Sequence, residues 1–249
     1  MRCFILQNMS FLSSLFANNT NNYKPKDERK AECPYCHKTL SKVPGSKTKC
    51  PHCGEFMFVR TRPKDNVRVV TTKNEAEKIE KERHEIATTE EFKKRLSDSP
   101  LYSEKKYLAI KDSLSRKFGA PPKEDDVLWG LSNYLLQEYI KKDDWQEIKM
   151  IYFNQALFLH EQGKDCFYIL KEVAKCELII LKKLDCFKRV EILTCNDQSC
   201  QECQKFSGKI FTIEQALKEM PIPVKECTCK LNPKAPSGWC RCMYISVID

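Results

Sequence analysis

Two cysteine pairs near the start of the chain have the residue types and spacing of a metal site. Cys33 and Cys36 form one Cys-x-x-Cys doublet, Cys50 and Cys53 form a second, and thirteen residues separate them. Both thiolates of such a turn converge on one point, and a tetrahedral zinc ion takes two such pairs. Gly54, which lacks a Cβ, suits the tight turn after a doublet. We therefore predict one zinc ion here, with reducible thiols or a disulfide as the alternatives.

A second group of seven cysteines lies near the other end: Cys195, Cys200, Cys203, Cys227, Cys229, Cys240 and Cys242. Cys200 and Cys203 form another doublet, and each Cys-x-Cys pair puts both thiols on one face of an extended chain. We predict one further zinc ion held by Cys200, Cys203, Cys240 and Cys242. Cys195, Cys227 and Cys229 are additional or alternative ligands, because two separate zinc ions need eight ligands unless a thiolate bridges them or Asp197 contributes. An iron–sulfur cluster or disulfides are the alternatives.

The net charge of +9 is concentrated around the first cysteine group. Residues 24–68 hold twelve Lys and Arg against five Asp and Glu, whereas residues 69–249 hold thirty against twenty-nine. A basic module of this kind attracts polyanions. Nucleic acid is the usual partner of such a charge, and an acidic protein surface is the alternative.

The run from residue 55 to residue 62 alternates as a β-strand does, and Pro63 ends it. Phe56, Phe58 and two arginines share one face of this strand. The phenylalanines either stack on bases or pack inside the molecule, and the arginines are the better candidates for contact. The predicted nucleic-acid contacts are Arg60, Arg62, Lys47 and Lys49.

The elements that must position these groups indicate a multidomain, mainly α chain. We expect a flexible segment over residues 1–30, a β zinc ribbon over 31–68, a helical domain over 72–188 and a Cys-rich α+β metal-binding domain over 189–249. Capping-box patterns at Thr72 and Thr88 predict helix starts near residues 73 and 89. Apolar periodicity then predicts four helices joined as antiparallel hairpins, over residues 103–118, 124–142, 144–162 and 166–184. Cys166, Cys176 and Cys186 and the histidines His84 and His160 are interpreted as ordinary core or surface residues.

No run of residues approaches the roughly 20 apolar residues that a membrane helix needs, and the first sixteen residues lack signal-peptide quality. With the cysteines grouped as metal ligands, the expectation is a cytoplasmic protein that binds no membrane. No small-molecule substrate is evident.

The C-terminal segment resembles a known family in several motifs. The Cys200-x-x-Cys203 doublet, the Gly-Lys-Ile-Phe run at residues 208–211, the Pro-Ile-Pro turn at 221–223 and the Cys-Arg-Cys at 240–242 are similar to the C-terminal domain of the phage Mu F-like minor-head family. The resemblance covers residues 193–244 and implies a small α+β domain with a metal centre that serves in phage head morphogenesis. It departs from the family where Gly238 and Trp239 replace a His-Pro pair. The N-terminal segment resembles a generic four-cysteine zinc ribbon.

Three functions follow from these features. The first is a non-catalytic zinc-binding adaptor whose ribbon binds nucleic acid or an acidic partner and whose C-terminal domain binds a protein. The second is a head-morphogenesis protein of the phage type. The third is a nuclease or modifying toxin, against which stand the absence of any histidine after His160 and of a phosphate-binding glycine loop.

Overall fold

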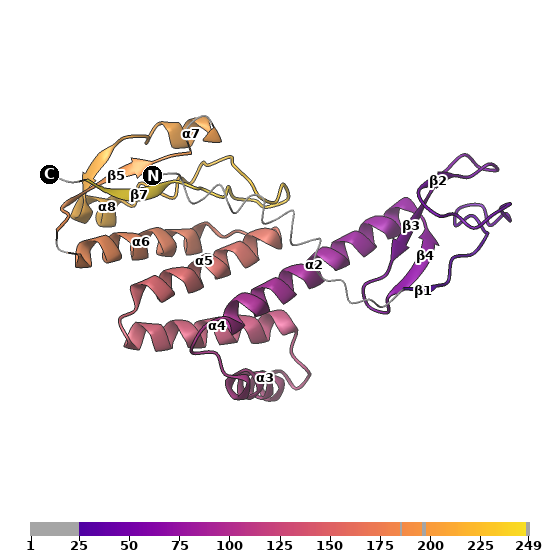
Figure 1. The fold of residues 1–249 in the computed structure, drawn as a ribbon, viewed down its shortest axis with the longest axis horizontal. Helices are drawn as coiled ribbons and strands as arrows, with labels where there is room; N and C mark the ends of the chain where they lie inside the picture. The colour runs from indigo at the N-terminus through magenta and orange to yellow at the C-terminus, as the bar shows by residue number, and fades with distance from the viewer. Residues whose placement is uncertain (1–24, 185, 196–197, 248–249) are drawn as a thin grey trace. The chain divides into compact units, whose positions relative to one another are not determined.

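The computed structural model describes residues 25–184, 186–195 and 198–247. They form two compact units, of which the first ends at His84 and the second begins at Glu85. The division falls inside the long helix α2 (Lys73–Ser97), so that each unit contains a part of it (Figure 1). Most of the segment 1–30, predicted to be flexible, lies outside the described residues.

A small sheet with strand order β1-β4-β3-β2 forms the first unit. Strands β3 (Phe56–Thr61) and β4 (Val67–Thr71) are antiparallel neighbours, β2 (Thr48–Lys49) runs antiparallel to β3, and β1 (Lys26–Asp27) runs parallel to β4. Alternation along β3 points Met57 into the core, where it is fully buried, and leaves Phe56 exposed. The buried cluster of this unit consists of Cys33, Leu40, Cys50 and Met57. Two of these four side chains are thiols, so the unit has little apolar core apart from its cysteines.

Helix α2 begins where the first capping box predicts. The Thr72 hydroxyl accepts from the Glu75 backbone N–H, and the Glu75 carboxylate accepts in return from the Thr72 backbone N–H at 3.0 Å. The second predicted start, near residue 89, is wrong because α2 continues through it. Thr88 is buried, and the Thr89 hydroxyl donates to the Glu85 carbonyl at 3.0 Å, a bond made inside a continuous helix.

Four helices of the second unit follow, and their bounds match the predicted ranges to within one residue at each end. They are α3 (Glu104–Phe118), α4 (Glu124–Lys141), α5 (Trp145–Glu161) and α6 (Phe167–Lys183). Gly119 ends α3 in the left-handed conformation, and the Asp144 carboxylate caps α5 by accepting from the Glu147 N–H. Consecutive helices pack on one another, as expected for helical hairpins (Figure 1).

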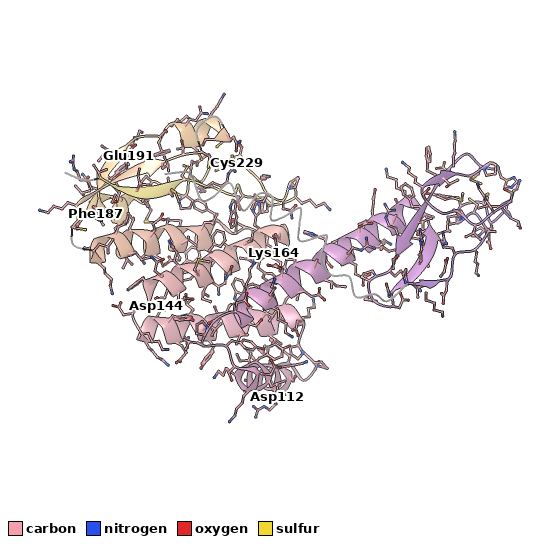
Figure 2. The ribbon with its side chains drawn as sticks, in the orientation of Figure 1. Asp112, Asp144, Lys164, Phe187, Glu191 and Cys229 are labelled. Carbon is pink, nitrogen blue, oxygen red and sulfur yellow. The ribbon has the colours of Figure 1, made fainter. Side chains whose placement is uncertain are left out.

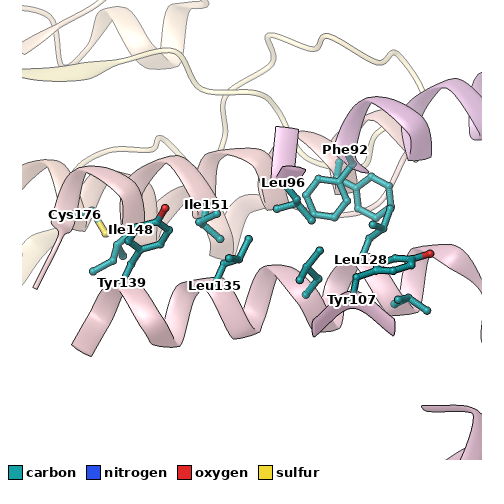
Figure 3. Close-up of a cluster of buried hydrophobic side chains, with 12 residues drawn as sticks. Phe92, Leu96, Tyr107, Leu128, Leu135, Tyr139, Ile148, Ile151 and Cys176 are labelled. Atoms are coloured by element: carbon teal, nitrogen blue, oxygen red, sulfur yellow. The ribbon is translucent and has the colours of Figure 1, made fainter. Parts of the chain in front are cut away.

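The helices enclose the main apolar core of the second unit (Figure 3). Phe92 of α2 stacks on Phe158 of α5 with ring centroids 4.2 Å apart. Leu96 and the α4 side chains Leu128 and Leu135 are fully buried in the same cluster. Close packing of this kind makes the loss of even a few methylene groups costly.

The C-terminal part of this unit is a sheet with strand order β6-β5-β7. β5 (Arg189–Leu193) pairs antiparallel with both β6 (Ile210–Thr212) and β7 (Met243–Val247). Helix α8 (Ile213–Glu219) starts with a capping box formed by Thr212 and Gln215, and the short α7 (Gln201–Gln204) carries Cys203. Because α6 packs against both α8 and β7, the segments 72–188 and 189–249 share one compact unit from residue 85 onward.

Helices account for much of the described chain, together with these two small sheets, so the predicted mainly α class holds in outline.

The helical core yields a matched pair of leucine substitutions. Leu135→Ala should lower the free energy of unfolding by about 2–5 kcal/mol, because Leu135 is fully buried and its loss leaves a cavity. Leu108→Ala, on the solvent side of α3 with 48% of the residue exposed, should cost far less. Urea unfolding followed by circular dichroism measures both, and equal losses would contradict the described core.

Candidate metal centres

The four N-terminal cysteines converge as a tetrahedral ion requires. Their Sγ atoms all lie within 4.8 Å of one another, with Cys33 and Cys53 at 3.7 Å and Cys36 and Cys50 at 3.9 Å. A tetrahedral zinc ion with Zn–S bonds of about 2.3 Å sets its sulfur ligands roughly 3.8 Å apart. A disulfide bond would bring two sulfurs to about 2.05 Å. The spacing therefore fits an all-thiolate metal site and not a disulfide.

The two doublets have the same local backbone geometry. In each, the N–H two residues after the first cysteine points at its sulfur: Tyr35 to Cys33 at 3.5 Å and His52 to Cys50 at 3.4 Å. Each turn then ends at a residue with positive φ, His37 at +59° and Gly54 at +79°. Gly54 was expected to play this role from its lack of a Cβ, whereas His37 adopts the same conformation with a side chain.

Ionisation of all four thiols in this site requires a cation. Burial alone would raise the Cys50 pKa, but the backbone N–H groups of Cys53 and His52 lower it to about 6. The Glu55 N–H lowers the Cys53 pKa, yet burial and the neighbouring thiols outweigh this effect and raise it to about 12. Four adjacent thiols cannot all ionise unless a positive ion lies among them, and a divalent metal supplies that charge.

The second cysteine group forms two clusters that share one residue. Cys200, Cys203 and Cys227 have Sγ atoms within 4.8 Å of one another, and so do Cys203, Cys240 and Cys242. The Cys200–Cys227 and Cys203–Cys240 sulfur pairs are both 3.8 Å apart, again the edge length of a tetrahedral thiolate site. These five cysteines could hold metal.

The four thiols predicted as one site are divided between these two clusters. Cys200 lies with Cys203 and Cys227, and Cys240 and Cys242 lie with Cys203, while the thiols of Cys227 and Cys240 also contact each other. This placement favours Cys227 as a ligand, although the sequence indicated it only as an alternative. Spacing alone did not single it out, because Cys227 lies 27 positions after Cys200, beyond α7, β6 and α8.

Cys195 and Cys229, the remaining predicted alternatives, border the same centre. A cavity of about 10 Å³ is lined by Cys195, Ser199, Cys203, Cys229, Arg241 and Cys242. Cys229 lies with Lys164 toward one end of the second unit, and Phe187 lies toward the other (Figure 2). Asp197, considered as a further ligand, is outside the described residues.

Backbone N–H groups favour ionised sulfur in this centre too. Burial alone would raise the Cys200 pKa, but the N–H groups of Cys203 and Thr228 lower it to about 6. Burial raises the Cys203 pKa, with a further contribution from Cys240. The Val224 N–H donates to the Cys240 sulfur at 3.3 Å. As in the first site, all these thiols can ionise together only around a cation.

The loop that carries Cys227 and Cys229 passes very close to the residues before Cys240. A Cβ on Gly238 would lie 1.8 Å from the carbonyl oxygen of Cys227 and 2.6 Å from its carbonyl carbon. The next residue, Trp239, donates its N–H to the Cys229 carbonyl at 2.6 Å. Only glycine permits this approach, which holds the two cysteine pairs side by side.

His160 of α5 holds the same loop against the helices. Its ring Nε2 accepts from the N–H groups of Leu231 and Asn232, each at 3.2 Å, and its Nδ1 lies 3.6 Å from the Cys166 sulfur. With Nε2 accepting twice, the neutral ring carries its proton on Nδ1 and donates it to Cys166. His160 was interpreted as an ordinary core or surface residue, and its fully buried ring is satisfied. No sequence spacing indicates this bond, since 71 residues separate His160 from Leu231.

The four residues predicted to bind nucleic acid differ in their surroundings. Arg60 forms an ion pair with Glu80, with Nε 2.6 Å from the carboxylate oxygen, and Arg62 pairs with Asp65 at 2.7 Å. Lys47 lies over the rings of Phe56 and Phe58, with Nζ 4.7 and 5.3 Å from their centroids. Lys49 is exposed on β2. The arginines are thus neutralised locally, and the lysines are not.

The close approach at Gly238 supports a glycine substitution test. Gly238→Ala should remove metal from the second centre and lower the free energy of unfolding by about 3 kcal/mol or more, because both atoms in the way are backbone atoms. Gly45→Ala is the control, since a Cβ there meets nothing within 4 Å. Elemental analysis and urea unfolding measure the two effects. Full metal content in the Gly238→Ala protein would refute the described loop packing.

The buried imidazole predicts a pH dependence of stability. Burial, and to a smaller extent the charge of Lys230, lowers the His160 pKa below its ordinary 6.5. The folded state therefore binds fewer protons than the unfolded state. The stability that neutral His160 contributes is complete above pH 6.5 and is lost as the pH falls through the pKa of His160 in the folded state.

The measurement compares unfolding free energies between pH 7.5 and 5 for the wild type and His160→Gln. Thiol protonation affects both proteins, so the difference between their slopes isolates His160. The exposed His84→Gln protein should follow the wild type. Identical slopes for the wild type and His160→Gln would contradict the prediction.

Comparison with known protein families, curated proteins and solved structures finds no match to this chain. The described part of the chain also contains no helix that is both long and apolar enough to cross a membrane. The two thiol centres and their surroundings are thus the features from which a function is argued.

Proposed function

We propose that this chain is a non-catalytic, zinc-dependent adaptor whose N-terminal ribbon binds nucleic acid and whose second unit is a protein-interaction module. The observation that carries the proposal is the set of exposed lysines on the ribbon that have no acidic partner among the described residues. The other features below support it.

The fold uses the ribbon's arginines and leaves the lysines of its cysteine loops without an acidic partner within the described residues. Besides the pairs made by Arg60 and Arg62, Arg29 pairs with Asp27 at 2.5 Å, and Arg68 donates to the Gly45 carbonyl at 3.0 Å. Lysines of the cysteine loops are exposed and have no ion pair within the described residues: Lys38, Lys42, Lys47 and Lys49. A phosphate backbone binds such a group of free ammonium ions with release of counterions.

An aromatic side chain lies within this lysine group. Phe56 is 48% exposed at the start of β3, next to Lys47. Its partner in the β2–β3 ladder is Lys49. An exposed ring flanked by cations is the arrangement on which single-stranded nucleic acids stack their bases while their phosphates bind nearby. An acidic protein would contact the same lysines but has no bases to stack on the Phe56 ring.

The metal sites support a structural role for zinc. The ribbon offers four thiolates, a complete tetrahedral set that leaves no position for a reactive water. Zinc in such sites contributes folding energy.

The Cys–His contact in the described part of the second unit does not support an enzyme. Cys166 and His160 are both fully buried, and burial raises the Cys166 pKa. A nucleophilic cysteine needs a lowered pKa and access to substrate. This pair therefore stabilises the core.

The proposal predicts which basic residues control binding. Lys47→Ala with Lys49→Ala should weaken binding to single-stranded DNA or RNA about tenfold and make the dependence of log K on log salt shallower by about 0.7 for each phosphate that the protein no longer neutralises. Arg60→Ala with Arg62→Ala should have the smaller effect, because both guanidinium groups are already paired. Fluorescence anisotropy at several salt concentrations measures both.

Lys105→Ala with Lys117→Ala is the matched control, since it removes two exposed lysines from α3 in the second unit. Binding that is insensitive to salt, or equally weakened by the α3 control, would refute the nucleic-acid interface. Binding to an acidic peptide but to no nucleic acid would replace it with the acidic-protein alternative.

A further inference from the structure

The arrangement of the second cysteine group leaves each of its clusters one ligand short. Each contains three sulfurs within 4.8 Å of one another, and Cys203 belongs to both. A tetrahedral structural zinc ion takes four ligands. A single ion in either cluster would also leave cysteines of the other without a cation, although Cys227 and Cys240 are both buried.

The two remaining cysteines border these clusters, just outside the two groups of three sulfurs. Cys195 and Cys229 line the same small cavity as Cys203 and Cys242. The Cys195 sulfur lies 4.0 Å from the carbonyl oxygen of Arg241, next to Cys242. Cys229 follows Cys227 by two residues and is held in place by the bond from the Trp239 N–H. Each cluster thus has one further thiol beside it.

The number of thiols then matches the number of metal bonds. Seven thiolates of which one is shared provide eight bonds, which is what two tetrahedral zinc ions accept. We propose that the second centre is a two-zinc thiolate cluster bridged by Cys203. One ion is held by Cys200, Cys203, Cys227 and Cys229, and the other by Cys195, Cys203, Cys240 and Cys242.

The burial of these residues fits the proposed roles. Cys203, which would bridge, is 2% exposed on the short helix α7, and its sulfur lies within 4.8 Å of the other two sulfurs of each cluster. Cys195, Cys200, Cys229 and Cys242 are half-buried, as expected of terminal ligands at the edge of a cluster. Seven thiolates around two divalent ions carry a net negative charge. The Val224 N–H at the Cys240 sulfur partly offsets it.

This inference rests on the proposal that the second centre binds zinc, and metal stoichiometry separates the two. Elemental analysis of the full chain purified without oxygen should give three zinc ions per chain, one in the ribbon and two in the second centre. Cys203→Ser should lower this to one, and Cys186→Ser, an exposed cysteine outside both clusters, should leave three. Two ions per chain in the wild type would overturn the two-zinc cluster and leave the zinc-dependent adaptor standing. One ion would overturn zinc binding at the second centre altogether, and none would overturn the zinc-dependent adaptor as well.

Cadmium substitution tests the bridge in the wild-type protein, without relying on a variant that fails to fold. Nuclear magnetic resonance of the ¹¹³Cd-loaded chain should show three resonances, two of which are coupled to each other through the shared sulfur. Cys229→Ser should move one member of the coupled pair strongly, because an oxygen replaces one of its four sulfurs, while Cys186→Ser should move neither. Three resonances without coupling would overturn the bridge by Cys203. An unchanged spectrum for Cys229→Ser would overturn the assigned ligand set.

Discussion

The constraint on which the rest of the structure depends is the close approach of cysteine sulfurs. At sulfur separations of 3.7 to 3.9 Å, thiols can neither form disulfides nor all ionise without a cation. Both cysteine groups also belong to hydrophobic cores: Cys33 and Cys50 are two of the four residues in the ribbon's buried cluster, and Cys203, Cys227 and Cys240 lie in the cluster beneath the C-terminal sheet. In the ribbon, where apolar burial is small, a bound metal would provide much of the folding free energy.

The ribbon's basic side chains differ in whether a carboxylate lies within their reach. Basic side chains on β3 and on the turn after it are long enough to reach carboxylates on a neighbouring segment, as Arg60 reaches Glu80 in α2 and Lys64 reaches Glu82. The lysines between the cysteines, Lys38, Lys42, Lys47 and Lys49, have no such partner within the described residues. Their charge stays in solvent, so the cysteine turns present a basic surface.

Sequence reasoning located the features that depend on local spacing and missed those that depend on long-range approach. The four helices from residue 104 to residue 183 follow from apolar periodicity and from stops such as Gly119. The helix start predicted at Thr88 failed because a capping pattern cannot reveal that Thr88 is buried inside a longer helix. Periodicity does not reveal that the sulfurs of Cys227 and Cys200 are in contact, or that Gly238 packs against the Cys227 backbone. Both depend on how segments distant in sequence pack together.

The second centre is not an independent module attached to the helices. His160 of α5 accepts from the loop between its cysteines, and the Glu177 carboxylate of α6 accepts from the Tyr244 N–H at 3.2 Å, one residue into β7 and two after Cys242. The Glu177 carboxyl is partly withdrawn from solvent, and this burial raises its pKa. The segment that holds the second cysteine group therefore shares contacts with α5 and α6, whereas the ribbon closes its sheet and its cysteine group with its own residues. Of the two thiol groups, the C-terminal one is thus tied to the helical body, and the N-terminal one to the ribbon.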